Sequence, residues 1–284
     1  MTIAFYEDSF GPTGWEVSPS KIYKPLKFPG GEAHVVDGQQ PLPRGEQVAW
    51  VPGADADSLM QLAMWADLCH RRDLRTVAVI PYLPGARQDR GAPLGAKVYA
   101  DFINSMNIDR IICFDPHSDV MPALLDRCRA VPLHEHPQWF ARQRPWDDVV
   151  GIIVPDVGAR RRAEGVAAAL GGVPLYQASK HRDFATGKLS GFECEPIALP
   201  NGKRLLVVDD ICDGGGTFIG LAQTLGLPRE SLSLWVSHGI FSKGTKDLFK
   251  HYSIIATTDS HPGSHELTTE VNVSHLFHFL YSRR

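Results

Sequence analysis

The chain has 284 residues, 43% of them hydrophobic, and a formal net charge of −3 at pH 7. This length can bury a substantial core and accommodates two domains of ordinary size. The slightly acidic balance gives no overall basic field, which argues against nucleic acid as a partner. The five cysteines include no Cys-x-x-Cys pair, and an odd number fits poorly with a disulfide framework. With neither a secretory leader nor an apolar stretch of membrane-spanning length, the sequence predicts a cytoplasmic protein without a membrane partner.

Short apolar runs alternate with helix-like segments along the chain. The runs predict buried strands at residues 76–81, 110–114, 149–154, 204–208, 232–236 and 253–256. Residues 58–70, 158–170 and 217–225 have the hydrophobic periodicity typical of helices. The alternation predicts an α/β fold with mainly parallel sheets flanked by helices.

Residues 134–148 are rich in Pro, Trp and Arg, and they lack a clear hydrophobic period. They separate two regions with similar spacing of strands and helices. We therefore expect an N-terminal domain of residues 1–145 and a C-terminal domain of residues 146–284.

Polar clusters follow the predicted strands, and ligands of parallel sheets collect at such strand ends. Arg87, Gln88 and Asp89 offer a guanidinium for phosphate, with an amide and a carboxylate for a purine or ribose, unless the loop is simply solvated. Asp115 and His117 are two residues apart and would point the same way in extended backbone, as ligands of a metal or a triphosphate. A turn with a helix N-cap is the alternative for this segment, and the same two interpretations apply to Asp156.

A further segment carries charge. Lys180 and Arg182 precede a mostly polar stretch, which predicts a mobile cationic loop that closes on phosphates during transfer. An exposed charge run of this kind is more often just solvated.

Two pairs of histidines, His134 with His136 and His261 with His265, have spacings found among metal ligands. No cysteines support them, so we expect no dedicated zinc site.

The segment at residues 204–217 is the most informative, because a hydrophobic strand leads into three carboxylates and a glycine turn before a predicted helix. Consecutive glycines let several backbone N–H groups point at one anion, and the helix dipole adds partial positive charge. A phosphate fits there without any lysine, whereas the carboxylates suit sugar hydroxyls or a divalent cation. A plain tight turn is the alternative, but it gains nothing from mutually repelling acids. The predicted phosphoribose site comprises Asp209, Asp210, Asp213, Gly214, Gly215, Gly216 and Thr217.

Taken in order, these motifs resemble ribose-phosphate diphosphokinase, also called phosphoribosyl pyrophosphate synthetase. The segment Phe28-Pro29-Gly30-Gly31-Glu32 is similar to the ATP-contact segment that a neighbouring subunit contributes in that family. The resemblance implies two similar domains of the type I phosphoribosyltransferase fold, assembled as a homodimer or a higher homo-oligomer. It implies ATP contacts by Phe28, Gly30, Glu32, Arg87, Gln88, Asp89 and His117. It implies magnesium as cofactor, with Asp115, His117 and Asp156 as metal ligands, and Lys180 and Arg182 as the catalytic pair.

The implied reaction is transfer of the pyrophosphoryl group of ATP to the C1 hydroxyl of ribose 5-phosphate, giving phosphoribosyl pyrophosphate and AMP. The chain departs from the family pattern at Gly30, Pro116 and residues 118–119, and has glycine at positions 214–215 where relatives often have Thr-Ala or Thr-Cys. A type I phosphoribosyltransferase that consumes phosphoribosyl pyrophosphate is the main alternative, although it has no need of the motifs at 87–89 and 115–117. A non-catalytic regulatory relative is the second.

Overall fold

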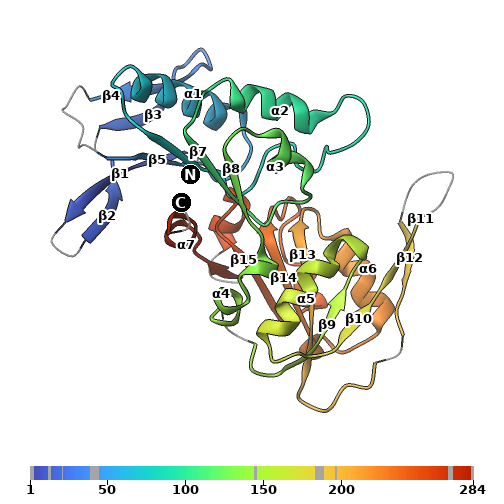
Figure 1. Ribbon diagram of the computed structural model, residues 1–284. Helices are drawn as coiled ribbons and strands as arrows, with labels where there is room; N and C mark the ends of the chain where they lie inside the picture. The colour runs from blue at the N-terminus through green and yellow to red at the C-terminus, as the bar shows by residue number, and fades with distance from the viewer. Residues whose placement is uncertain are drawn as a thin grey trace. The chain divides into compact units, whose positions relative to one another are not determined.

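The computed structural model describes residues 3–11, 14–20, 22–38, 45–143, 146–182, 189–195, 197–267 and 271–282 (Figure 1). The chain forms two compact units. Unit 1 comprises Met1–Val131 and His275–Arg284, and unit 2 comprises Pro132–Ser274.

Unit 1 is built on a six-stranded sheet with the order β2-β1-β5-β6-β7-β8. Strands β5 to β8 pair in parallel, whereas β1 pairs antiparallel with both β2 and β5. A separate antiparallel ribbon consists of β3 and β4. The strands are β1 (Ala4–Gly11), β2 (Gly14–Pro19), β3 (Tyr23–Lys27), β4 (Ala33–Asp37), β5 (Gln47–Trp50), β6 (Thr76–Val79), β7 (Arg110–Phe114) and β8 (Cys128–Val131). The helices are α1 (Ala56–His70), α2 (Gly95–Asn104), α3 (Val120–Leu124) and α7 (Phe277–Tyr281).

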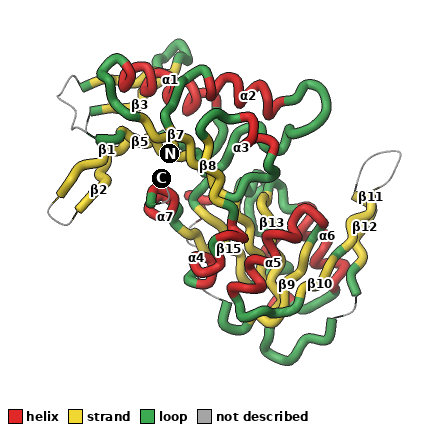
Figure 2. Tube along the Cα trace, viewed as in Figure 1, coloured by secondary structure: helices red, strands yellow, loops and turns green. Residues whose placement is uncertain are grey.

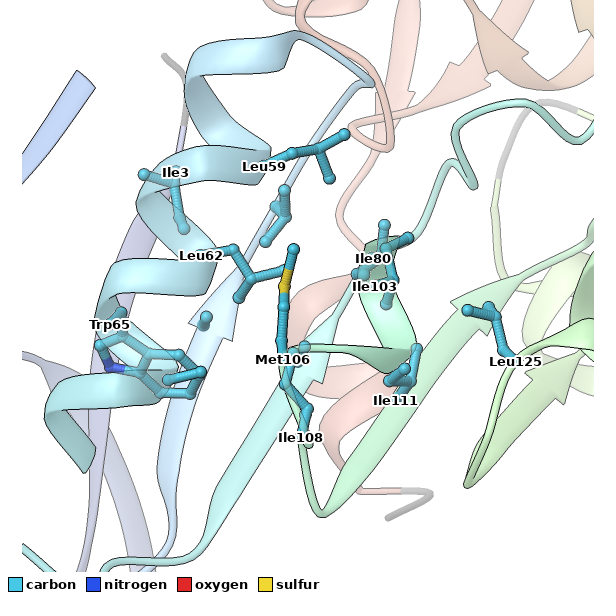
Figure 3. Close-up of a cluster of buried hydrophobic side chains, with 14 of the residues drawn as sticks. Ile3, Leu59, Leu62, Trp65, Ile80, Ile103, Met106, Ile108, Ile111 and Leu125 are labelled. Atoms are coloured by element: carbon cyan, nitrogen blue, oxygen red, sulfur yellow. The ribbon is translucent and has the colours of Figure 1, made fainter. Parts of the chain in front are cut away.

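The core of unit 1 lies between the sheet and its helices (Figure 3). Helix α1 begins where the Asp55 carboxylate accepts a hydrogen bond from the Ser58 amide at 2.9 Å, a normal N-cap. Its buried face places Leu62 and Trp65 against the sheet, and Trp65 stacks on Phe5 at a ring distance of 5.8 Å. The apolar residues that give this helix its predicted periodicity therefore face the core.

Unit 2 contains a second six-stranded sheet, β10-β9-β13-β14-β15-β16, in which every pairing is parallel. Helices α5 and α6 connect strands of this sheet, as Figure 2 shows by the alternation of red and yellow. The strands are β9 (Val149–Val154), β10 (Leu175–Gln177), β13 (Arg204–Cys212), β14 (Leu232–Gly239), β15 (Ile254–Thr258) and β16 (Asn272–Ser274). The helices are α4 (Pro137–Ala141), α5 (Arg160–Ala169) and α6 (Gly216–Leu225). An antiparallel ribbon is formed by β11 (Ser179–Arg182) and β12 (Leu189–Glu193). Short 3-10 turns occur at Leu133–Glu135, Val157–Ala159, Arg229–Ser231, Leu248–Lys250 and Pro262–Leu267.

The division between the units differs from the boundary expected between residues 145 and 146. The segment after Pro132 packs within unit 2, where Phe140 stacks on Trp146 at 5.3 Å and meets Trp235 of β14 edge-on at 5.0 Å. The last helix, α7, packs on β6 and β7 of unit 1 instead of continuing unit 2. Aromatic packing on each sheet, which hydrophobic periodicity does not reveal, explains both differences.

The predicted fold class, α/β with mainly parallel sheets flanked by helices, is confirmed. In the described part of the chain, no helix combines the length and apolar character needed to cross a bilayer.

Candidate active site

The glycine turn after β13 has the backbone that an anion site requires. Gly215 has a φ of 78°, in the left-handed region, and Gly216 is the first residue of α6. A β-carbon at Gly215 would lie 3.2 Å from a methyl carbon of Leu248, whereas one at Gly216 would meet nothing within 4 Å. Gly215 is thus needed for both its conformation and its contact, whereas the space beside Gly216 at the start of α6 is open.

Two of the predicted acids form a pair at the end of β13. Asp210 is buried, and its backbone amide donates to Asp209 Oδ1 at 2.9 Å. Burial and the neighbouring Asp210 charge raise the pKa of Asp209 well above its usual value, while the Arg162 guanidinium opposes that shift. Arg162 is itself buried, on the face of α5 that packs on β13. This arginine balances part of the negative charge and was missed by the sequence analysis.

The third acid, Asp213, is held from a different loop. Its Oδ1 accepts a hydrogen bond from Ser242 Oγ at 2.6 Å, and its carbonyl accepts one from the Ser242 amide at 3.2 Å. The carbonyl of Cys212, one residue earlier, accepts from the amides of Ile240 and Phe241 at 2.9 and 3.1 Å. The loop after β14 is therefore joined to the glycine turn by several hydrogen bonds, which fix where Asp213 lies.

Asp156 lies at the same edge of the sheet, because β9 pairs with β13 in a register that opposes Ile153 to Val207. Its Oδ1 accepts hydrogen bonds from the amides of Gly158 and Ala159 at 3.0 and 3.3 Å. The carboxylate thus caps the short turn before α5, which is the structural alternative that the sequence left open. Both bonds use Oδ1.

Lys180 and Arg182 belong to strand β11, not to a loop. Lys180 is paired with Phe192 and Arg182 with Leu189, and the register shifts between His181 and Arg182. The side chains of residues 180–191 and the whole of residues 183–188, on which the predicted lid depends, lie outside the described part. At the base of this ribbon is a hollow of about 660 Å³, lined by Leu175, Tyr176, Gln177, Ser179, Glu193, Cys194 and Glu195.

In unit 1, the loops that follow β6 and β7 meet. The Asp89 carboxylate accepts a hydrogen bond from Ser118, and together with the nearby charges of Arg90 and His117 this bond lowers the pKa of Asp89. Two motifs that the sequence predicted separately, at 87–89 and 115–117, are therefore one cluster. Ser118, which sequence reasoning treated only as a departure from the family pattern, is the residue that connects them.

Gln88 and Asp115 are the most constrained members of this cluster. A β-carbon at Gly95, the first residue of α2, would lie only 1.8 Å from Gln88 Oε1. The side-chain amide of Gln88 therefore occupies the space that the missing side chain of Gly95 leaves. Asp115 is buried and has a φ of 37°, which is unfavourable for a residue with a β-carbon. Its amide donates to the carbonyl of Val131 on β8 at 3.0 Å. Such backbone strain is found preferentially at functional sites.

Phe28, Gly30 and Glu32 form the tip of the β3–β4 ribbon. The Phe28 amide donates to the carbonyl of Glu32 at 2.9 Å, closing the turn, and Gly31 has a φ of 101°. Phe28 is 46% exposed and rests against the His34 ring at 5.3 Å. The tip therefore presents an aromatic ring and a carboxylate to the surroundings of unit 1.

The predicted metal ligands do not all fall in one unit, because Asp115 and His117 belong to unit 1 and Asp156 to unit 2. Within the ranges that the structure describes, no group of three or more His, Cys, Asp or Glu side chains is arranged to hold a metal ion. The ligand set stays a prediction.

Comparison with known proteins identifies the class. A ribose-phosphate pyrophosphokinase from Hyphomonas neptunium is 30% identical over 244 residues, covering 80% of this chain and 76% of the relative. The ribose-phosphate pyrophosphokinase from Vibrio parahaemolyticus is 30% identical over 236 residues, covering 78% and 72%. The crystal structure of phosphoribosylpyrophosphate synthetase from Mycobacterium smegmatis matches with a TM-score of 0.73 at 24% identity, covering 92% of this chain and 88% of that one. No family model matches the chain.

The shared fold and the extent of the sequence match define a transferase of the α/β class. The chain belongs to the ribose-phosphate pyrophosphokinase family.

Proposed function

We propose that this chain transfers the β,γ-pyrophosphoryl group of ATP to the C1 hydroxyl of ribose 5-phosphate, releasing AMP. The observation that supports this reaction best is the cradle at the end of β13, where the glycine turn and the N-terminus of α6 adjoin three acids, two of them fixed by hydrogen bonds. Backbone N–H groups of residues 214–217 bind the 5-phosphate, and Asp213 orients the ribose hydroxyls. Family membership supports the direction of the reaction, since the relatives are named pyrophosphokinases.

The cluster in unit 1 is the proposed nucleotide site. Arg87 and Gln88 contact the nucleotide, and His117 faces its phosphates beside Asp89. The hydrogen bond from Ser118 lowers the pKa of Asp89 and so favours its ionised carboxylate in this cluster. The exposed Phe28 tip supports the proposal that a neighbouring subunit of a homodimer or higher homo-oligomer completes this site.

Magnesium is the proposed cofactor, because the carboxylate oxygens of Asp115 and Asp156 are of the kind that this hard cation prefers. The proposed ligands are Asp115 and His117 within unit 1 and Asp156 within unit 2, where the paired acids of β13 lie at the same sheet edge as Asp156. When bound, it neutralises charge on the triphosphate. Lys180 and Arg182 neutralise the charge that develops as AMP leaves. All five cysteines are free, which fits a cytoplasmic location.

The deciding experiment incubates the full chain with ATP, magnesium and ribose 5-phosphate and measures AMP. AMP formation that depends on ribose 5-phosphate is the expected result. Base-dependent release of pyrophosphate from phosphoribosyl pyrophosphate would instead show a transferase, and tight ATP binding without AMP would show a non-catalytic relative.

Two variants test the assigned roles. Lys180→Ala should lower kcat, while Asp213→Ala should raise the KM for ribose 5-phosphate. Lys203→Ala is the matched control for Lys180, because it removes one exposed positive charge from the turn before β13. A change in Lys180→Ala confined to KM would contradict its transition-state role.

A further inference from the structure

The loop after β14 contacts the glycine turn at several of its residues. Phe241 is buried with a φ of 48°, and its amide bonds to the carbonyl of Cys212. Further along, the side chain of Leu248 packs over Gly215. The loop is therefore a fixed second wall of the phosphate cradle, contributed from more than twenty residues further along the chain.

Between these two contacts, Lys243 lies across Gly214. A β-carbon at Gly214 would be 3.4 Å from both Cδ and Cε of Lys243, which is ordinary van der Waals contact. The lysine stem is thus held against the first glycine of the turn, and its ammonium is one bond beyond Cε. Among the described residues, Lys243 makes no hydrogen bond or ion pair. The Asp213 carboxylate accepts a hydrogen bond from Ser242, the residue directly before Lys243.

We propose that Lys243 binds the 5-phosphate of the sugar substrate and sets the preference of the site for phosphorylated over free ribose. The backbone N–H groups of the cradle carry only partial charges, and three carboxylates lie close by, so a phosphate dianion gains from a full positive charge. An ammonium group on a flexible stem supplies that charge without demanding a fixed geometry. This inference rests on the proposed function of the cradle.

The test compares Lys243→Ala, Lys243→Arg and Lys203→Ala with the unmodified chain. Lys203 is exposed and directly precedes β13, so the Lys203→Ala variant removes the same charge at the opposite end of that strand. We expect Lys243→Ala to raise the KM for ribose 5-phosphate about tenfold, the size of one charge-assisted hydrogen bond. The KM for ATP and kcat should stay the same, Lys243→Arg should restore most of the affinity, and Lys203→Ala should change nothing.

An unchanged KM for ribose 5-phosphate in Lys243→Ala would overturn the inference. So would an equal rise in Lys203→Ala, because the effect would then reflect overall charge. A rise in the KM for ATP alone would place Lys243 at the nucleotide instead.

Direct titration with inorganic phosphate separates this inference from the proposed reaction. If the unmodified chain forms no AMP, the proposed function fails, but phosphate binding still reports on Lys243. Phosphate affinity about tenfold weaker in Lys243→Ala than in Lys203→Ala would sustain the inference, and equal affinities would refute it. Denaturant unfolding of each variant, measured in parallel, confirms that the compared chains are folded.

Discussion

Ser242 donates its hydroxyl to Asp213, with 2.6 Å between Ser242 Oγ and Asp213 Oδ1. The two residues are 29 positions apart in sequence, yet the bond joins the loop after β14 to the turn after β13. Since the Ser242 amide also donates to the Asp213 carbonyl, both ends of the aspartate are held. The acid that we assign to the ribose hydroxyls is therefore positioned before substrate arrives.

Removing this bond should weaken sugar binding. Ser242→Ala is expected to raise the KM for ribose 5-phosphate roughly fivefold, which corresponds to one hydrogen bond of about 1 kcal/mol. The KM for ATP should not move. Ser282→Ala is the control, because it loses an exposed hydroxyl bond to the Phe279 carbonyl at 2.8 Å. Steady-state kinetics of both variants check the prediction, and an unaltered sugar KM in Ser242→Ala would contradict it.

Two adjacent glycines should respond in opposite ways to alanine. Gly215→Ala forces a β-carbon into the left-handed region and against Leu248, so it should lower the free energy of unfolding by at least about 1–2 kcal/mol. Gly216→Ala has open space and lies at the start of a helix, where alanine should be neutral or stabilising by up to about 0.5–1 kcal/mol. Urea unfolding measures both values. Equal effects would show that the backbone of the turn differs from the one described.

Asp156 can be tested for its two roles separately. Asp156→Asn keeps an oxygen that accepts from the amides of Gly158 and Ala159, so stability should change little. Asp156→Ala loses the cap and should cost about 1 kcal/mol. If the carboxylate also binds magnesium, both variants should raise the magnesium concentration needed for half-maximal AMP formation. A normal magnesium requirement in Asp156→Asn would leave Asp156 with only its capping role.

Gly95→Ala should act on the nucleotide through Gln88. The new β-carbon would lie 1.8 Å from Gln88 Oε1 and 2.8 Å from Gln88 Cβ, so the amide must swing away and the backbone that carries Gln88 must shift as well. We expect a roughly fivefold rise in the KM for ATP, the size of one lost hydrogen bond, together with a loss of stability of about 1 kcal/mol or more. The Gln88→Ala variant and the double variant complete a cycle, in which Gly95→Ala should have no further effect on the KM for ATP once Gln88 is absent. Additive effects would mean that Gly95 acts by another route.

Ser118 should influence stability only where Asp89 is ionised. Its hydrogen bond lowers the pKa of Asp89, so the folded state binds the proton less tightly than the unfolded state does. The resulting stability is present above the ordinary carboxyl pKa of about 3.9 and is lost as pH falls through the lowered value. Ser118→Ala should therefore destabilise the chain at pH 7, and the difference in stability should shrink as pH falls below the ordinary carboxyl pKa and through the lowered pKa of Asp89. A constant difference across this range, or the same difference in an Asp89→Asn background, would exclude the Asp89 link.

The central strands were predicted well because burial on both faces leaves an unbroken apolar run. Residues 110–114 and 149–154 have the same limits in the structure as in the prediction. Strand β13 instead continues to Cys212 through two acids, since its ladder with β14 extends to Gly239. Acidic residues have low strand propensity, so the sequence predicted an earlier end. In the first fifty residues no strand was predicted. Strand β3 exposes four of its five residues, and β5 is buried but has only four residues and begins with the polar Gln47, so neither forms a long apolar run.

The candidate site was predictable where a motif is contiguous and hidden where it depends on pairing. The acids and glycines of residues 209–217 are adjacent in sequence, so their shared chemistry was evident. Ser242 and Lys243 come near them only because β14 pairs with β13 in parallel and both strands end at one edge. Placement after a buried strand would have been a signal for this loop, since the motifs at 87–89, 115–117, 156 and 209–217 all follow a predicted strand. No local pattern indicates that Arg162 turns inward from α5.

The path of the chain has a consequence for its synthesis. Helix α7 follows the whole of unit 2 along the chain, yet Phe277 stacks on Tyr6 at 4.2 Å and Phe279 meets Phe114 at 6.3 Å, all within unit 1. Domains generally fold as units while the chain is being made, the N-terminal one first. Here the strands of unit 1 emerge first but lack their last aromatic layer until residues 277–281 appear. Unit 2 can complete its sheet earlier, so the half of the protein that is made first is finished last.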